Sequence, residues 1–138
     1  MNNLEKVCRI CELGDFEQEP KIVTGGLLHK MYCVETNQGK YAIKVLNSNV
    51  MNKPDALEKL EQAERIAYRL KNENDISAIC VKSVAGKMIF EVDHAYYEIF
   101  EWFDGKSVFY PEKQPYPYLL SHGLFRSLLQ FLRHLRPT

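Results

Sequence analysis

The amino-acid sequence predicts an α+β domain with an antiparallel sheet. Short apolar runs with strand-like alternation follow one another closely and are separated by turn residues, a pattern typical of strands joined by hairpins. One longer stretch with helical spacing follows the third run, so the predicted order is β-β-β-α-β-β-β. We therefore expect a five- or six-stranded antiparallel sheet with one inserted helix, together with an N-terminal and a C-terminal helix.

The strands are predicted from alternation and from the turns that bound them. The first three lie between Lys21 and Asn47, where Thr24-Gly25-Gly26 and Asn37-Gln38-Gly39 provide the breaks. The third strand lies in GKYAIKVLN, residues 39–47; it has apolar residues on both faces and should be largely buried. The other three are expected at residues 79–84, 88–92 and 96–102, with turns at Ala85-Gly86 and Asp93-His94.

The helices are predicted from apolar stripes at helical spacing. Residues 4–13 form a short amphipathic stretch that ends at Gly14 and is followed by an acidic linker. The inserted helix begins near Pro54-Asp55, with Asn52 or Asp55 as its cap. Its expected buried stripe is Ala56, Leu60, Ala63, Ala67 and Leu70. A last helix is expected over residues 119–135, with the stripe Leu120, Leu124, Leu128, Phe131 and Leu135.

Composition limits the classes of function. The chain has 138 residues, 46% of them hydrophobic and 26% charged, which suits one globular domain or a piece of a larger protein. The net charge is zero, so bulk electrostatics favours neither a nucleic acid nor a membrane surface as partner. No stretch has the length of a signal peptide core or a membrane span, and we expect a cytoplasmic protein with reduced cysteines.

The pair Cys8 and Cys11 forms a C-x-x-C motif. A structural zinc site needs four ligands, and no second close pair accompanies this one. Because both cysteines lie inside the predicted N-terminal helix, we expect buried or half-buried thiols rather than metal or redox chemistry.

Lys44 lies in the middle of the third predicted strand. A buried ammonium without a partner costs several kcal/mol, so this side chain must be paired or must face a polar cavity. The simpler alternative is that its aliphatic stem covers apolar surface while its head group reaches water. Three other features favour a functional role for Lys44.

The first feature is Gly25-Gly26, because adjacent glycines let backbone amides approach an anion closely. The second is Glu64, a carboxylate that borders the apolar stripe of the inserted helix; Glu61, one turn earlier, is the rival. The third is the aromatic run YYEIFEWFDG at residues 96–105, which suits the wall of a flat purine pocket.

In this order the features resemble the N-terminal lobe of the protein-kinase fold. Val23 to Leu28, Met31-Tyr32, Thr36, Gly39 and the run from Tyr41 to Asn47 are similar to the aminoglycoside phosphotransferase and choline kinase-like family. The strand lysine is of the A-I-K type, and EIFEWFDG resembles the hinge strand of that family. The resemblance covers residues 20–107. It divides the chain into a helix and linker (1–19), a kinase-like lobe (20–107) and a basic, leucine-rich tail (108–138).

The resemblance implies an ATP-binding site with Mg²⁺, whose ligands are expected in the other lobe. Lys44 would contact the α- and β-phosphates, and Glu64 would hold Lys44 in place. Gly25 and Gly26 would bring the loop over the phosphates. The adenine would meet the remaining candidates, by packing or by backbone hydrogen bonds: Ala42, Phe100, Glu101, Trp102 and Phe103. The alternative for the aromatic residues is a plain core role, and for Glu64 a solvated helix position.

The sequence departs from this family in two ways. The loop is Gly25-Gly26 rather than G-x-G-x-x-G, and no aspartate lies in an H-x-D-x-x-x-x-N pattern or serves as a second metal ligand. We therefore expect the nucleotide-binding lobe of a small-molecule kinase without its catalytic lobe, inactive by itself, with an acceptor only if a C-terminal lobe is present. The tail over residues 108–138 is either the start of a truncated lobe or an altered sequence after a frameshift.

Two further functions remain open at this stage. The chain could be a non-catalytic α+β module that recognises a protein partner, or a degenerate product without activity. The apolar stripe in residues 119–135 would pack on the sheet or drive self-association into a homo-oligomer.

Overall fold

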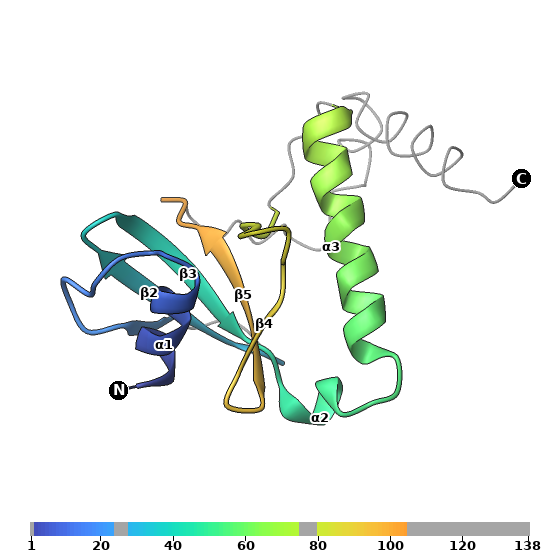
Figure 1. The fold of residues 1–138 in the computed structure, drawn as a ribbon, viewed down its shortest axis with the longest axis horizontal. Coiled ribbons are helices and arrows are strands. Elements are labelled where there is room, and N and C mark those ends of the chain that lie inside the picture. The colour runs from blue at the N-terminus through green and yellow to red at the C-terminus, as the bar shows by residue number, and fades with distance from the viewer. Residues whose placement is uncertain (1, 24–27, 75–79, 105–138) are drawn as a thin grey trace, which may run out of the picture.

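The computed structural model describes residues 2–23, 28–74 and 80–104. The elements of this part follow in the order α1 (Asn3–Ile10), β1 (Lys21–Val23), β2 (Lys30–Thr36), β3 (Gly39–Val45), α2 (Ser48–Met51), α3 (Ala56–Glu73), β4 (Phe90–Val92) and β5 (Ala95–Glu101). Figure 1 shows α1 in front of the sheet and α3 beside the edge that β4 and β5 form. The predicted C-terminal helix and the tail lie outside the described residues.

The five strands form one antiparallel sheet in the order β1-β2-β3-β5-β4. This confirms the predicted antiparallel sheet of an α+β fold. Strand β3 is central, between β2 and β5, because the chain leaves the sheet for α2 and α3 and returns on the far side of β3. The return brings together two strands that are distant in sequence, with Lys44 opposite Glu98 and Ala42 opposite Phe100.

Two predicted turns form hairpins. In the first, Thr36 pairs with Gly39, so Asn37-Gln38 is the loop between β2 and β3. In the second, Val92 pairs with Ala95 around Asp93-His94, and these two residues have φ angles of 49° and 65°. Positive φ at both positions is the geometry of the turns that match strand twist, and Asp tolerates it better than most residues. The expected Thr24-Gly25-Gly26 turn lies outside the described residues.

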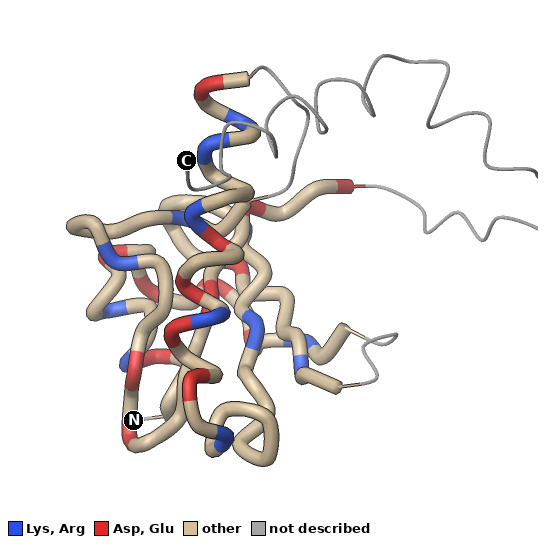
Figure 2. The backbone as a smooth tube through the Cα atoms, turned by 90° about the vertical axis from the view of Figure 1, so that its right-hand side faces the viewer, with Lys and Arg blue, Asp and Glu red and all other residues tan. Residues whose placement is uncertain are grey.

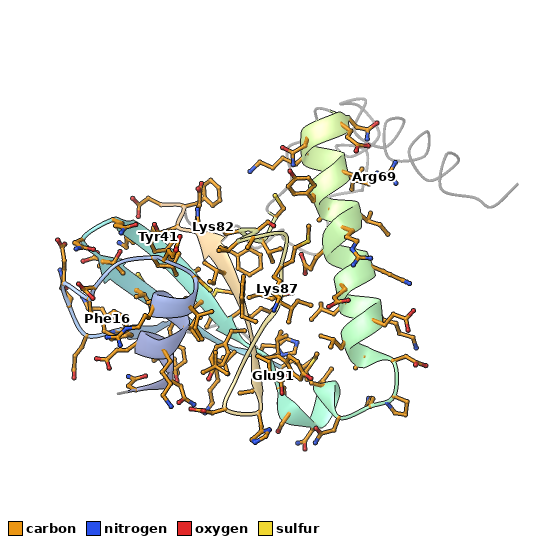
Figure 3. All side chains as sticks on the ribbon, in the orientation of Figure 1. Phe16, Tyr41, Arg69, Lys82, Lys87 and Glu91 are labelled. Atoms are coloured by element: carbon orange, nitrogen blue, oxygen red, sulfur yellow. The ribbon has the colours of Figure 1, made fainter. Side chains whose placement is uncertain are left out.

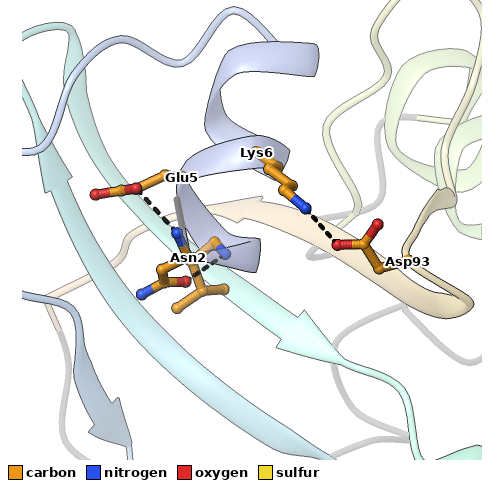
Figure 4. A network of polar contacts seen from close by, with 5 residues as sticks. Asn2, Glu5, Lys6 and Asp93 are labelled. Atoms are coloured by element: carbon orange, nitrogen blue, oxygen red, sulfur yellow. Dashed lines mark hydrogen bonds and ion pairs between the residues drawn. The ribbon is translucent and has the colours of Figure 1, made fainter.

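Helix α1 begins at a capping box. The Asn2 side chain accepts the N–H of Leu4, and the Glu5 carboxylate accepts the N–H of Asn2 at 3.0 Å (Figure 4). Such a box satisfies backbone donors that the first turn would otherwise leave free. Lys6 of the same helix forms an ion pair with Asp93 of the β4–β5 turn, with Nζ 2.6 Å from the carboxylate oxygen (Figure 4).

The hydrophobic core lies between α1 and one face of the sheet. Val7 of α1 is fully buried, as are Val34, Ile43 and Ile99 of three adjacent strands. The rest of this core comes from Leu4, Cys8, Cys11, Leu13, Phe90, Val92 and Tyr97. The N-terminal helix is therefore part of the same hydrophobic core as the strands, and its side chains exclude water from that face.

The chain between α1 and β1 is tied to the β2–β3 hairpin. The buried Thr36 hydroxyl donates a hydrogen bond to the Leu13 carbonyl, and the Asn37 side chain accepts the N–H of Asp15 at 3.0 Å. Gly14, the predicted helix terminator, has φ of 96°, and a Cβ there would collide with the Asn37 side chain. Glycine is thus required both by the backbone conformation and by the close approach.

Helix α3 differs from its prediction in burial. It begins after Asp55, which has φ of 63° and forms no side-chain cap. No residue of α3 is buried by the part of the chain that the structure describes, and Ala63 of the expected stripe is exposed. The stripe correctly predicted the helix, but within residues 2–23, 28–74 and 80–104 its other members are only half-buried: Ala56, Leu60, Ala67 and Leu70. Helix α2, a single turn capped by Asn47, was not predicted.

The strand expected at residues 79–84 is absent from the described residues 80–84. The backbone there forms an isolated bridge, Val84 with Lys87 around Ala85-Gly86, and one hydrogen bond from the Lys82 N–H to the Ile99 carbonyl of β5. This segment instead runs past α3. Together with Leu57 and Arg65 of α3 it lines a cavity of about 800 Å³, and Lys87 and Glu91 lie on the side of the strands that faces the helix (Figure 3).

Acidic and basic residues are interspersed along the described backbone (Figure 2), in keeping with the net charge of zero. Among the described helices, none has the length and apolar character needed to cross a bilayer.

Candidate functional site

Lys44 lies on the face of the sheet opposite to α1. Its neighbour Ile43 points into the core, and alternation along β3 therefore turns Lys44 away from it. The Lys44 side chain is 28% exposed, so it is neither fully in solvent nor fully buried. Its Nζ lies 6.0 Å from the ring centroid of Phe100, at the outer limit of a cation–π contact.

The partner of Lys44 is Glu98 of β5. The two residues are opposite each other in the β3–β5 register, and cross-strand pairs share one face of a sheet. Lys44 Nζ lies 3.7 Å from a Glu98 carboxylate oxygen, a loose ion pair. The Glu98 side chain is 0% exposed, and neither of its oxygens has a hydrogen-bond partner among the described residues.

Burial and a second carboxylate change the acidity of Glu98. Its pKa is raised to about 8, first by loss of hydration and then by the neighbouring Glu64 carboxylate, which favours the protonated form of Glu98. The Lys44 ammonium lowers the pKa of Glu98, but by less than burial and Glu64 raise it. With a pKa of about 8, Glu98 holds its proton near pH 7.

Helix α3 therefore contributes Glu64 to the surroundings of Lys44. Glu61, the rival from the same helix, lines the 800 Å³ cavity with Arg65 instead. The resemblance implied a direct Lys44–Glu64 pair. Among the described ion pairs, however, Lys44 is joined to Glu98, and Glu64 is the neighbour of Glu98.

The candidates for adenine contact differ in their surroundings. Ala42 and Phe100 are opposite each other on the Lys44 face of the sheet, and Ala42 is buried. Glu101 is exposed at the end of β5, and the Phe103 side chain is 62% exposed. An apolar pair thus lies next to Lys44 on this face, and an exposed aromatic residue follows the end of the strand.

Trp102 is held by two contacts. Lys40 Nζ lies 5.0 Å from its ring centroid, and its indole N–H donates to Asp104 at 2.9 Å. Its backbone N–H also donates to the Lys40 carbonyl, which extends the β3–β5 pairing by one bond. These contacts fix the segment after β5, where the hinge of a nucleotide site is expected.

Gly25 and Gly26 lie outside the described residues. The described chain continues from Leu28, and the next residue, His29, lies near Lys44. The His29 Nδ1 accepts the N–H of Asn47 at 2.8 Å, and the pKa of His29 is lowered by lost hydration and by the Lys44 charge. His29 is therefore neutral near pH 7, and Lys44 supplies the positive charge.

The C-x-x-C cysteines are buried in the core, as predicted. Burial raises the pKa of Cys8 to about 11 and that of Cys11 to about 12. Because the thiolate is the reactive and metal-binding form, such thiols are poor nucleophiles near neutral pH. Among the described residues, no group of three or more His, Cys, Asp or Glu side chains is arranged to hold a metal ion.

The site contains a residue that sequence reasoning missed. Glu98 lies in an apolar, aromatic strand, which is the same anomaly that drew attention to Lys44. Alternation along the strand places Glu98 on the same face as Tyr96 and Phe100. Its pairing with Lys44 of β3, however, depends on where the chain re-enters the sheet after α3. An acidic residue inside an apolar strand was therefore the available signal.

No protein-family model matches the chain, and no curated protein matches it. What the protein is can thus be stated at the level of its fold: an α+β protein with a five-stranded antiparallel sheet and, on one face, a half-buried lysine beside a buried carboxyl.

Proposed function

We propose that the chain is the nucleotide-binding lobe of an ATP-dependent kinase for small molecules, similar to the aminoglycoside phosphotransferases and choline kinases. The observation that carries the proposal is Lys44, a half-buried cation on the central strand that is accompanied by a carboxyl of β5 and a carboxylate of α3. In that fold a lysine on the third strand contacts nucleotide phosphates and depends on a helix glutamate for its orientation.

The surroundings of Lys44 support a nucleotide rather than a free anion. The apolar pair Ala42 and Phe100 continues the face away from Lys44, and Glu101 to Phe103 follow at its edge. A purine is flat and apolar on its faces, and its polar edge suits backbone groups at a strand end. The acceptor of the phosphoryl group is expected to be a hydroxyl of a small molecule.

The proposal concerns binding, because the 138 residues contain no H-x-D-x-x-x-x-N pattern. Phosphoryl transfer and Mg²⁺ coordination would need residues that this sequence does not provide. A reducing, cytoplasmic compartment is part of the proposal, since four free cysteines accompany the site or the core.

The test is nucleotide binding by the chain and by Lys44→Met. Mg-ADP should shift the backbone amide resonances of Ala42, Lys44 and Glu101. A lysine–phosphate hydrogen bond contributes roughly 1.5–3 kcal/mol, so the variant should bind about ten- to hundredfold more weakly. Lys30→Met is the matched control, because Lys30 is an exposed lysine of the adjacent strand on the other face.

The variant should keep its fold, since Glu98 can stay protonated when the ammonium is lost. A variant that binds Mg-ADP as tightly as the unmodified protein would refute the role of Lys44. Glu64→Gln should weaken the same binding by roughly 1–3 kcal/mol, because it removes the carboxylate beside Glu98.

A second function is a protein-binding module, and the 800 Å³ cavity favours it. Apolar Leu57, Met88 and Ile89 line this cavity, and Ile10 at its rim is 55% exposed. Peptide binding without any response to millimolar Mg-nucleotide would support the module. Shifts at Lys44 and Glu101 with nucleotide alone would support the kinase lobe.

A further inference from the structure

Glu98 is a buried charge-bearing group that nucleotide binding by Lys44 does not by itself explain. The side chain is 0% exposed, both oxygens lack a hydrogen-bond partner among the described residues, and one oxygen is 3.7 Å from Lys44 Nζ. Burying an ionised carboxyl group costs free energy unless an ion pair or hydrogen bonds compensate it. A protonated carboxyl is uncharged and avoids most of this cost. Glu98 and Lys44 are opposite each other in the β3–β5 register, so a change in the charge of one side chain acts directly on the other.

The charged groups around Glu98 come from three elements. Strand β3 contributes Lys44, and α3 contributes Glu64. From the other neighbouring strand, β4, Glu91 pairs with Tyr96 and lines the cavity beside α3. His29 lies near Lys44 but carries no charge near neutral pH, since its pKa is lowered.

We infer that Glu98 is a positioning residue for Lys44, and that the gain or loss of its proton sets how strongly the site binds a nucleoside polyphosphate. This inference rests on the proposed function. The resemblance gives the positioning of Lys44 to the helix glutamate alone, whereas here Glu98 of β5 also has that role.

With its proton, Glu98 is uncharged beside the Glu64 carboxylate, and one of its oxygens lies 3.7 Å from the Lys44 ammonium. The cluster then has one negative and one positive charge. The Lys44 ammonium then stays on this face of the sheet, and its positive charge remains available to bind a phosphate group.

When Glu98 releases the proton to solvent, two carboxylates face one ammonium and the cluster becomes negative. Repulsion between that charge and the phosphates opposes binding, and Lys44 is drawn toward Glu98. Polyphosphate affinity should therefore fall as the pH rises through the range in which Glu98 ionises.

The first experiment measures the affinity for ADP by calorimetry at several pH values. The pKa of Glu98 is about 8, so if only the protonated form binds, the dissociation constant should rise about tenfold between about pH 7 and pH 9. Phosphate groups titrate near pH 6, below this window, so the ligand keeps its charge. A flat profile would overturn the inference.

Three variants separate positioning from a merely structural role. Glu98→Gln imitates the protonated carboxyl, so it should bind as tightly as the unmodified protein at pH 7 and lose the pH dependence. Glu98→Leu offers no acceptor to Lys44 and should bind about tenfold more weakly at pH 7, as expected for one lost hydrogen bond to a charged group. Glu58→Gln, at an exposed position of α3 outside the proposed site, is the control and should keep the pH profile.

Carbon-13 NMR of the glutamate carboxyls tests the same cluster without nucleotide. The Glu98 resonance should titrate several pH units above the ordinary value of 4.5, and Glu64→Gln should move it toward that value. If the carboxyl behaves so but ADP does not bind at any pH, the proposed function fails while the cluster stands. If Glu98 titrates like an exposed glutamate, the inference fails whether or not ADP binds.

Discussion

The stability of the folded chain should fall between acidic and mildly basic pH because of Glu98. The pKa of this carboxyl is about 8 in the folded chain against an ordinary value of 4.5, chiefly because burial disfavours the charged form. Below the ordinary value both folded and unfolded chains hold the proton, and no free energy is lost. Above it the unfolded chain releases the proton first, so stability falls until the folded carboxyl also ionises near pH 8.

The expected magnitude follows from this difference in pKa. Each pH unit between the two pKa values removes roughly 1.4 kcal/mol, so the loss between about pH 5 and pH 8.5 is on the order of 4 kcal/mol. That is a large part of the roughly 5–15 kcal/mol that stabilises a typical domain. Glu98→Gln cannot ionise, so its stability should lack this component of the pH dependence.

Urea unfolding at the two pH values measures the effect. With a slope of about 1–3 kcal/mol per molar urea, the midpoint of the unmodified chain should fall by more than about 1 M relative to Glu98→Gln. Glu101→Gln, exposed on the same strand, should follow the unmodified chain. Equal differences between Glu98→Gln and the unmodified chain at both pH values would refute the burial of a protonated carboxyl.

Three further predictions concern the core and its boundary. Ile43→Ala should lower the free energy of unfolding by about 2–5 kcal/mol in thermal or urea melts, whereas Ile22→Ala, at a position 60% exposed, should change it little. Gly14→Ala should lower the melting temperature, because φ is 96° and a Cβ has no room; an unchanged melt would contradict this. Cys8 and Cys11 should react with a thiol reagent at pH 8 far more slowly in the native chain than in urea, and rapid native labelling would show accessible thiols.

Local pattern was enough for most of the strands and turns. The hairpin at Asn37-Gln38 and the turn at Asp93-His94 were predicted because turn residues and alternation are properties of a few neighbouring residues. The failure at residues 80–84 has the opposite cause. An apolar run becomes a strand only if a neighbouring strand offers its backbone groups, and along these residues the pairing is limited to the bridge of Val84 and one hydrogen bond from Lys82 to Ile99 of β5.

Burial was less predictable than secondary structure. The resemblance separated the N-terminal helix (1–19) from the kinase-like lobe, but Val7 and Cys8 of this helix lie in one core with the strands. The stripe of α3 looked like a core face, but its residues are not buried by the described part of the chain. An apolar stripe shows which side of a helix favours burial, and the tertiary structure decides whether anything covers it.

The sequence by itself determined that Lys44 would lie on a strand among apolar neighbours, because alternation is set by the backbone. It also indicated that this lysine would be paired, face a polar cavity or reach water with its head group, because an unpaired buried charge is too costly. Only the tertiary structure decided that it has a partner, and which carboxyl this is. The return of the chain after α3 places β5 next to β3, which sets Glu98 opposite Lys44 and brings Glu64 to the same cluster. Register between strands distant in sequence depends on the packing of the whole sheet rather than on any local pattern.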